Sequence, residues 1–174
     1  MNLFNVYPRF NITLTKGKGV YVYDDKNKYL DLYGGHGVIS IGHSHPTYVN
    51  KLKEQLDAIG FYSNSVEMPI QNELAVKLAK QSGYPDHSLF LCNSGAEANE
   101  NAIKLASFHT NKKKVIAFKG SFHGRTAATL NITDNPNLSA SVNNNNFPVE
   151  FIELNNEKAL LNALKNKDVC AVII

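Results

Sequence analysis

Hydrophobic and polar positions in the first part of the chain indicate a β-hairpin followed by two helices. β-rich runs at residues 19–23 and 29–32 flank a short polar segment, which is typical of a hairpin. A loop rich in Gly and His follows at residues 34–46. Apolar residues then recur at helical spacing and predict amphipathic helices over residues 46–59 and 70–82. A proline suits the first turn of the first helix, and a glycine lies just past the end of the second.

From residue 89 onward, short apolar runs alternate with helical patterns. The runs that predict strands lie at residues 89–92, 115–118, 149–154 and 169–174. Helical spacing between them indicates helices over residues 97–108 and 159–164 and a short element over residues 127–131. Such alternation predicts an α/β fold in which helices cover both faces of a parallel sheet. Because the last residues form an apolar strand, we expect the chain to be part of a longer protein.

Composition and charge exclude several classes of protein. The 174 residues are 43% hydrophobic, which is enough for a buried core. The net charge of +3 is small and the lysines are scattered, which argues against a nucleic-acid partner. Cys92 and Cys170 lack metal-binding spacing, the N-terminus lacks the pattern of a signal peptide, and no apolar run has the length of a membrane span. We therefore predict a cytoplasmic protein with no membrane partner. The asparagine run at residues 143–146 is typical of an exposed loop.

The sequence Asn-Ser-Gly-Ala-Glu-Ala-Asn-Glu at residues 93–100 indicates a turn that leads into a helix. Backbone amides at a helix N-terminus are unpaired and carry partial positive charge, so a phosphate binds there readily. Gly95 would let a ligand come close to the backbone, and the Ser94 hydroxyl adds a donor. The alternative is that Ser94 only caps its helix. The glycine spacing is that of neither a P-loop nor a Rossmann site, which disfavours another nucleotide-binding α/β domain.

A second motif, Gly-Ser-Phe-His-Gly-Arg-Thr at residues 120–126, follows a predicted strand. The Phe122 ring could stack on a planar cofactor, and the Arg125 guanidinium could hold a carboxylate by two parallel hydrogen bonds. A single Phe usually belongs to a core and a single Arg to a surface. The glycines at 120 and 124 favour the functional interpretation, because they indicate a shaped loop after a buried strand.

Histidines are the only other candidate ligands, and we expect no metal site. His36, His43, His45 and His123 lie in Gly-rich segments. His43 and His45 are two residues apart and have no carboxylate at helical spacing, whereas metal sites need three or four convergent ligands. Loop structure is the better interpretation of these residues.

The motifs together resemble the class III pyridoxal-phosphate-dependent aminotransferases over nearly the whole chain. The matching segments are residues 17–24, 42–46, 93–100 and 121–126. Within the family, the chain is most similar to aminotransferases of the acetylornithine or succinylornithine type, which serve arginine biosynthesis. The resemblance implies an aspartate-aminotransferase-like fold (pyridoxal-phosphate-dependent transferase fold type I) and a homodimer. Residues 1–60 would contribute to the small domain and the active-site entrance, and residues 61–174 would form the first part of the large, cofactor-binding domain.

The resemblance also implies site residues. The family's cofactor-binding positions match Ser94, Gly95, Ala96 and Phe122, and its substrate-binding positions match Arg125, Tyr7 and Tyr62. The first three would hold the phosphate of pyridoxal 5'-phosphate, Phe122 would stack on the pyridine ring, and Arg125 would bind the substrate α-carboxylate. Tyr7 and Tyr62 could equally be packing or interface residues.

The departure from the family pattern lies in what the chain lacks. No lysine here matches the one that forms a Schiff base with the cofactor, so no catalytic residue is assigned. We expect the N-terminal half of an enzyme, inactive by itself. The whole enzyme would move an amino group between N-acetylornithine or N-succinylornithine and 2-oxoglutarate. The alternative is a non-catalytic dimerisation or regulatory module derived from an aminotransferase.

Overall fold

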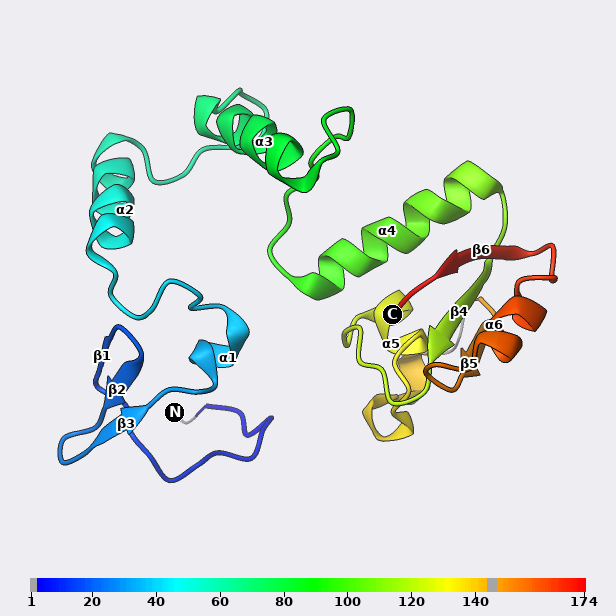
Figure 1. Ribbon diagram of the computed structural model, residues 1–174, viewed down its shortest axis with the longest axis horizontal. Helices are drawn as coiled ribbons and strands as arrows, with labels where there is room; N and C mark the ends of the chain where they lie inside the picture. Colours follow the sequence, from blue (N-terminus) through cyan, green and yellow to red (C-terminus); the bar gives the residue numbers. More distant parts are fainter. Residues whose placement is uncertain (1–2, 144–146) are drawn as a thin grey trace. The chain divides into compact units, whose positions relative to one another are not determined.

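A computed structural model describes residues 3–143 and 147–174 (Figure 1). The chain divides into two compact units, residues 1–69 and 70–174. The sequence placed a boundary nine residues earlier, after residue 60, and its assignment of the two parts to a small and a large domain stays a prediction. Most of the asparagine run predicted as a loop, residues 144–146, lies outside the described residues.

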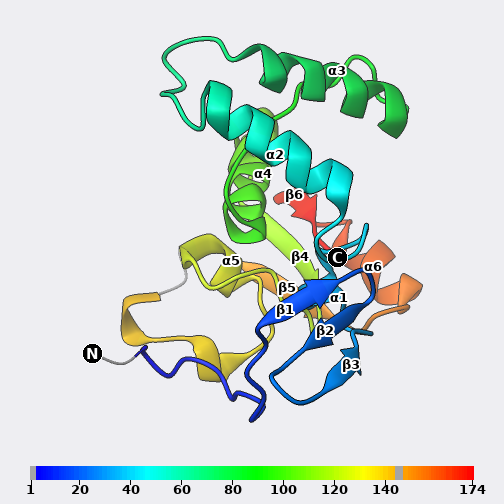
Figure 2. The ribbon, with the colours of Figure 1, turned by 90° about the vertical axis from the view of Figure 1, so that its left-hand side faces the viewer.

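The N-terminal unit contains a small antiparallel sheet. Its strands are β1 (Lys16–Lys18), β2 (Tyr21–Tyr23) and β3 (Lys28–Leu30), in the order β1-β2-β3 (Figure 2). The predicted hairpin is therefore confirmed, and β1 extends it. In its turn the Asp24 carboxylate accepts hydrogen bonds from the Tyr29 hydroxyl and the Lys26 amide. These bonds lower the pKa of Asp24 to about 2, and the bond from Tyr29 has the largest effect.

The loop after the hairpin makes a left-handed turn, α1 (Gly34–Gly37). All its residues have positive φ, at 58°, 57°, 71° and 73°. Glycine adopts this conformation freely, which explains why three of the four residues are glycines. His36 is the one residue of this turn with a Cβ, for which the left-handed conformation is sterically unfavourable.

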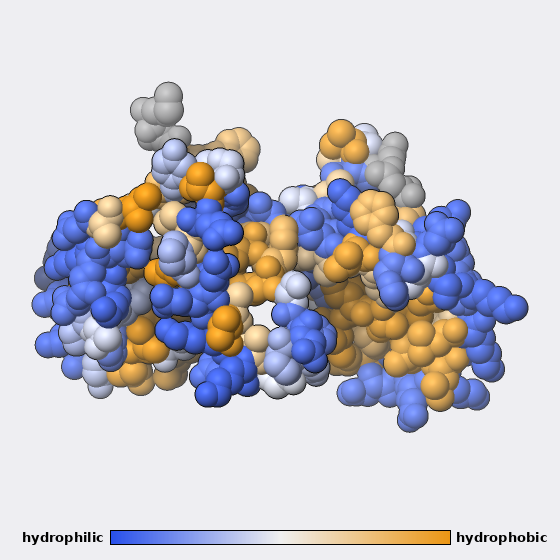
Figure 3. All heavy atoms as spheres, turned by 90° about the horizontal axis from the view of Figure 1, so that it is seen from above, coloured by the Kyte–Doolittle hydropathy of each residue, from blue (hydrophilic) through white to orange (hydrophobic). Residues whose placement is uncertain are grey.

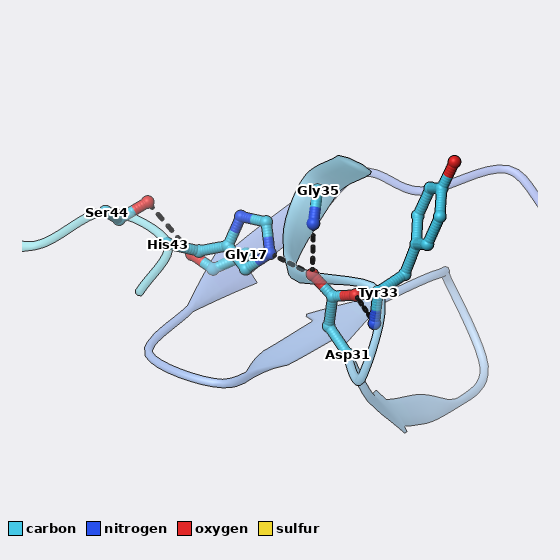
Figure 4. Close-up of polar contacts among 6 residues, drawn as sticks. All are labelled: Gly17, Asp31, Tyr33, Gly35, His43 and Ser44. Carbon is cyan, nitrogen blue, oxygen red and sulfur yellow. Dashed lines mark hydrogen bonds and ion pairs between the residues drawn. The ribbon is translucent and has the colours of Figure 1, made fainter. Parts of the chain in front are cut away.

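Asp31 and His43 fasten this loop to the sheet (Figure 4). The Asp31 carboxylate accepts hydrogen bonds from the amides of Tyr33 and Gly35, both at 3.0 Å, and contacts His43 Nε2 at 2.7 Å. The His43 contact is the main reason why the pKa of Asp31 lies below its usual value. His43 thus has a structural role in the loop, as the sequence indicated.

Helices α2 (Pro46–Ala58) and α3 (Pro69–Ser82) confirm the two predicted amphipathic helices. Neither buries a residue, although the structure describes both in full. Tyr48 of α2 is 53% exposed and Ile70 of α3 is 49% exposed. Figure 3 shows hydrophobic side chains among hydrophilic ones on the face that it draws. None of the helices in the described ranges is long and apolar enough to cross a membrane.

The C-terminal unit contains a parallel sheet with β4 (Lys114–Phe118) in its centre. β5 (Val149–Ile152) and β6 (Val169–Val172) lie on either side of β4, and both run parallel to it. The elements α5 (Ala127–Asn131), η1 (Pro136–Leu138) and η2 (Ser141–Asn143) follow β4 along the chain. The predicted parallel sheet is confirmed.

Helices cover both faces of β4. On one face, Val115 and Ala117 pack with Ile103 of α4 (Gly95–Thr110) and with Ile132. On the other face, Ile116 and Phe118 pack with residues that include Ala163 of α6 (Glu157–Ala163). Side chains of a strand alternate between the two faces of a sheet, so the residues from Val115 to Phe118 enter the two clusters in turn. Figure 1 shows α4 and α6 beside the sheet.

The predicted strand at residues 89–92 is wrong. The structure assigns no strand there, and Leu89, Phe90 and Leu91 are 39%, 61% and 48% exposed. A strand exists only when its backbone groups pair with those of a neighbouring strand. Within residues 3–143 and 147–174 no segment pairs with these residues, so their apolar character alone does not make a strand.

Candidate active site

The start of α4 carries a reciprocal cap between Ser94 and Glu97. The Ser94 hydroxyl accepts a hydrogen bond from the Glu97 amide at 3.2 Å and donates one to the Glu97 carboxylate at 2.9 Å. That carboxylate also accepts from the Asn93 amide at 3.0 Å. The Ser94 hydroxyl is the first cause that lowers the pKa of Glu97. Ser94 therefore does cap its helix. The sequence analysis missed Glu97, although Ser-x-x-Glu is the signature of a capping box.

Two amides remain available at this helix start. Within the described part of the chain, the main-chain N–H groups of Gly95 and Ala96 meet no acceptor. This is common in the first turn of a helix, where amides have no carbonyl of the same helix to bond. A Cβ added to Gly95 would meet no heavy atom within 4 Å, and the φ of this residue is not positive. The fold itself does not require a glycine at position 95. An open space in front of two unpaired amides fits a phosphate group.

The loop at residues 119–126 lies against the first turn of α4. A Cβ on Gly124 would stand 2.8 Å from the Ala96 Cβ and 2.5 Å from the Thr129 Oγ1. Only a glycine allows this close approach. Gly120, near the beginning of the loop, has a φ of 73° and donates its amide to the Asp134 carboxylate at 2.8 Å. The prediction of a shaped loop is confirmed.

Side chains of α4 hold the same loop. Asn99 Nδ2 donates to the carbonyl oxygen of His123 at 3.0 Å. Glu100 Oε1 accepts from the Thr126 hydroxyl at 2.6 Å. Ala96, Asn99 and Glu100 are spaced i, i+3 and i+4, so they share one face of the helix. The sequence analysis did not assign Asn99 or Glu100, and this helical spacing was the signal that could have identified them.

The two segments enclose a hollow of about 640 Å³, within the usual range for small-molecule sites. Its lining residues are Gly95, Ala96, Asn99, Phe122, His123, Gly124, Arg125 and Thr126. Of the predicted site residues, Gly95, Ala96, Phe122 and Arg125 are therefore brought together, and Ser94 directly precedes them. Phe122 is 61% exposed, so its ring is accessible to a ligand.

His123 contributes a buried side chain to this lining. It is 9% exposed, and its Nε2 has no hydrogen-bond partner in the described residues. Burial lowers the pKa of His123, because the charged imidazolium loses its hydration. Burial therefore favours the neutral imidazole over the charged form. Its main chain is held at both ends, since its amide donates to Thr133 Oγ1 at 3.0 Å and its carbonyl accepts from Asn99.

Tyr7 and Tyr62 belong to the N-terminal unit, whereas the whole lining of the hollow comes from the C-terminal unit. Their side chains are 56% and 54% exposed. Contact of these tyrosines with a substrate stays a prediction.

Comparison with known proteins identifies relatives of this chain. The chain is 39% identical over 174 residues to acetylornithine aminotransferase from Archaeoglobus fulgidus, a match that covers 99% of this chain and 46% of that protein. It is 45% identical over 133 residues to the acetylornithine aminotransferase of Halalkalibacterium halodurans, covering 76% of this chain and 34% of that protein. The chain thus spans less than half the length of these relatives.

A solved structure shows the same fold. The ornithine aminotransferase from Toxoplasma gondii superposes with a TM-score of 0.88 at 26% identity, covering 96% of this chain and 41% of that one. The predicted aspartate-aminotransferase-like fold is confirmed. The family "Aminotransferase class-III" matches residues 5–174. The chain therefore belongs to the class III aminotransferases, the pyridoxal-phosphate-dependent family that its motifs resemble.

Proposed function

We propose that this chain supplies the phosphate- and carboxylate-binding part of an aminotransferase that acts on an N-acylated ornithine and 2-oxoglutarate. The observation that carries the proposal is the hollow between α4 and the 119–126 loop. It combines two amides that lack acceptors in the described residues, an accessible aromatic ring and a guanidinium. A phosphorylated aromatic cofactor and an amino-acid carboxylate require these groups.

The residues of the hollow fit pyridoxal 5'-phosphate. The amides of Gly95 and Ala96 would hold the phosphate, helped by the positive end of the α4 dipole. The Ser94 hydroxyl would join them by turning its one proton from the Glu97 carboxylate to the phosphate. The exposed face of Phe122 would stack on the pyridine ring. When bound, the cofactor supplies an electron sink, which allows an amino group to leave one substrate and join another.

Arg125 would orient both substrates. The amino acid and 2-oxoglutarate each carry a carboxylate next to the reacting carbon, so one guanidinium can serve both halves of the reaction. Its planar fork binds a carboxylate through two parallel hydrogen bonds. We propose that Tyr7 and Tyr62 contact the substrate at the entrance. Substrate contact would require these tyrosines to reach the hollow, either in this subunit or in a homodimer.

The whole enzyme requires more than these residues. The chain covers 46% of its Archaeoglobus fulgidus relative, and we infer that none of its lysines is the one that binds the cofactor covalently in this family. We propose that this chain alone does not transaminate and that the intact enzyme is a cytoplasmic homodimer of arginine biosynthesis. The acetylornithine aminotransferases among its relatives support the acylated substrate.

Turnover by the intact enzyme tests the proposal. Loaded with pyridoxal 5'-phosphate and 2-oxoglutarate, it should form glutamate faster from N-acetylornithine or N-succinylornithine than from ornithine, and the 174-residue chain should form none. A preference for unacylated ornithine would contradict the substrate assignment. Size-exclusion chromatography of this chain with the intact enzyme tests the alternative regulatory module, since only that module should co-elute and change turnover.

A further inference from the structure

Glu100 makes three hydrogen bonds that leave its own helix. Its Oε1 accepts from the Thr126 hydroxyl at 2.6 Å, from the Ala128 amide at 2.7 Å and from the Thr129 amide at 3.2 Å. Hydrogen bonds to an ionised acceptor are about twice as strong as neutral ones. The Glu100 carboxylate thus caps α5 from outside and ties the start of α5 to α4.

Arg125 lies between two fixed points because of this contact. On its C-terminal side, Thr126 is held by Glu100 and by its reciprocal cap with Thr129. On its N-terminal side, Gly124 packs on Ala96, and its carbonyl accepts from Thr133 Oγ1 at 3.2 Å. On the N-terminal side of Arg125, packing on α4 holds Gly124. On the C-terminal side, the Glu100 carboxylate holds Thr126 to α4.

We propose that Glu100 is a positioning residue for substrate recognition: it fixes the backbone at Thr126 and so sets where the Arg125 guanidinium meets the substrate carboxylate. The proposal rests on the proposed function, in which Arg125 binds that carboxylate. Glu100 reaches neither the substrate nor the cofactor in this role. It acts through Thr126 and the first turn of α5.

The physical reason is geometric. Two parallel hydrogen bonds require the guanidinium and the carboxylate to be coplanar at a fixed distance. A misplacement of about 1 Å can reduce turnover about 100-fold. Without the Glu100 carboxylate, the amides of Ala128 and Thr129 lose their shared acceptor, and the chain after Arg125 is free to shift. The phosphate-binding amides of Gly95 and Ala96 belong to the first turn of α4, which precedes Glu100, and should keep their positions.

The test compares Glu100→Ala and Glu100→Gln in the intact enzyme, with Asn101→Ala as a matched substitution on the same helix. We expect Glu100→Ala to raise the KM for the amino acid about tenfold, with a smaller rise for Glu100→Gln, whose amide oxygen still accepts. The dissociation constant of pyridoxal 5'-phosphate should change less than about twofold, because its binding groups are untouched. Asn101→Ala should leave both constants at their wild-type values, since the hydrogen bond of the Asn101 side chain to the Glu97 carbonyl stays within α4.

Hydrogen exchange in the cofactor-free enzyme gives a readout independent of activity. A peptide that contains Ala128 and Thr129 should exchange faster in Glu100→Ala than in wild type or Asn101→Ala. Unchanged exchange together with an unchanged KM would overturn the proposal. Equal losses of cofactor affinity and substrate affinity would also overturn it, since they would indicate a general loss of structure.

A double-mutant cycle with Arg125→Ala separates this proposal from the one on which it rests. If Glu100 acts through Arg125, adding Glu100→Ala to Arg125→Ala should raise the KM no further. Additive effects would overturn the role of Glu100 and leave that of Arg125 intact. An unchanged KM in Arg125→Ala alone would instead refute the carboxylate assignment.

Discussion

Gly124 and Ala96 touch so closely that a Cβ on the glycine would stand 2.8 Å from the Cβ of the alanine. This contact joins the loop that carries Phe122 and Arg125 to the helix start that carries the amides of Gly95 and Ala96. Asn99 and Glu100, on the same face of α4, add hydrogen bonds beside it. The candidate site therefore depends on how one helix face fits one loop.

Gly124→Ala should destabilise the C-terminal unit. The added Cβ would overlap Ala96 and Thr129, and the φ of 142° is strained for any residue with a side chain. Overpacking of this kind costs about 1–3 kcal/mol. Urea unfolding measures the loss. Gly120→Ala is the matched control, because a Cβ there meets nothing within 4 Å and only its positive φ of 73° is unfavourable. An equal loss of stability in both variants would show that the cost of Gly124→Ala comes from backbone strain and not from contact with Ala96.

Gly95→Ala should separate stability from cofactor binding. The Cβ would enter open space with no heavy atom within 4 Å, so the free energy of unfolding should change by less than about 0.5 kcal/mol. The same Cβ would occupy the space in which we place the phosphate. We expect the affinity of the intact enzyme for pyridoxal 5'-phosphate, measured by absorbance titration, to fall about tenfold or more. Wild-type affinity in this variant would show that the phosphate does not bind at the start of α4.

Arg125→Ala should reduce kcat/KM for the amino acid about 100-fold in the intact enzyme, since a bidentate ion pair contributes several kcal/mol. Arg125→Lys should recover only part of the loss, because an ammonium group cannot donate two parallel hydrogen bonds. Cofactor absorbance should stay as in wild type. Lys119→Ala is the control for loss of a nearby cation, since Lys119 pairs with Glu153 at 2.7 Å on the surface. Equal effects of Arg125→Ala and Lys119→Ala would indicate general electrostatics instead of a specific carboxylate site.

His123 should make the C-terminal unit less stable in mild acid. Its pKa is lowered in the folded chain by burial, so the unfolded chain binds more protons once the pH falls below the usual histidine pKa of about 6.5. Folding stability is therefore fully present above that pH and declines as the pH drops toward the lowered pKa. Urea unfolding at a series of pH values should show this decline in wild type.

His123→Asn should flatten that pH profile, because asparagine does not titrate. His87→Asn removes an exposed histidine of the same unit and should keep the wild-type slope. If both variants flatten the profile alike, burial of His123 is not the cause of the acid sensitivity.

Local patterns in the sequence determined most of the secondary structure. The hairpin at β2 and β3, the helices α2, α3, α4 and α6 and the strands β4 to β6 all follow from periodicity and turn residues, because these signals lie within a few neighbouring positions. The motif at residues 93–100 likewise indicated a helix start able to bind an anion. The left-handed turn at Gly34–Gly37 was indicated only as a Gly-rich loop, since composition does not specify which φ values the glycines adopt.

Tertiary structure decided what the chain does with these elements. The apolar run at residues 89–92 forms no strand, because strand formation requires a pairing partner that local sequence does not specify. The contact of Gly124 with Ala96 and the three hydrogen bonds of Glu100 join residues more than twenty positions apart. Sequence alone indicated Gly95, Ala96, Phe122 and Arg125, which the structure brings together around one hollow. Only the packing of α4 against its loop determined how they are held together, because contacts between distant segments depend on the complete fold.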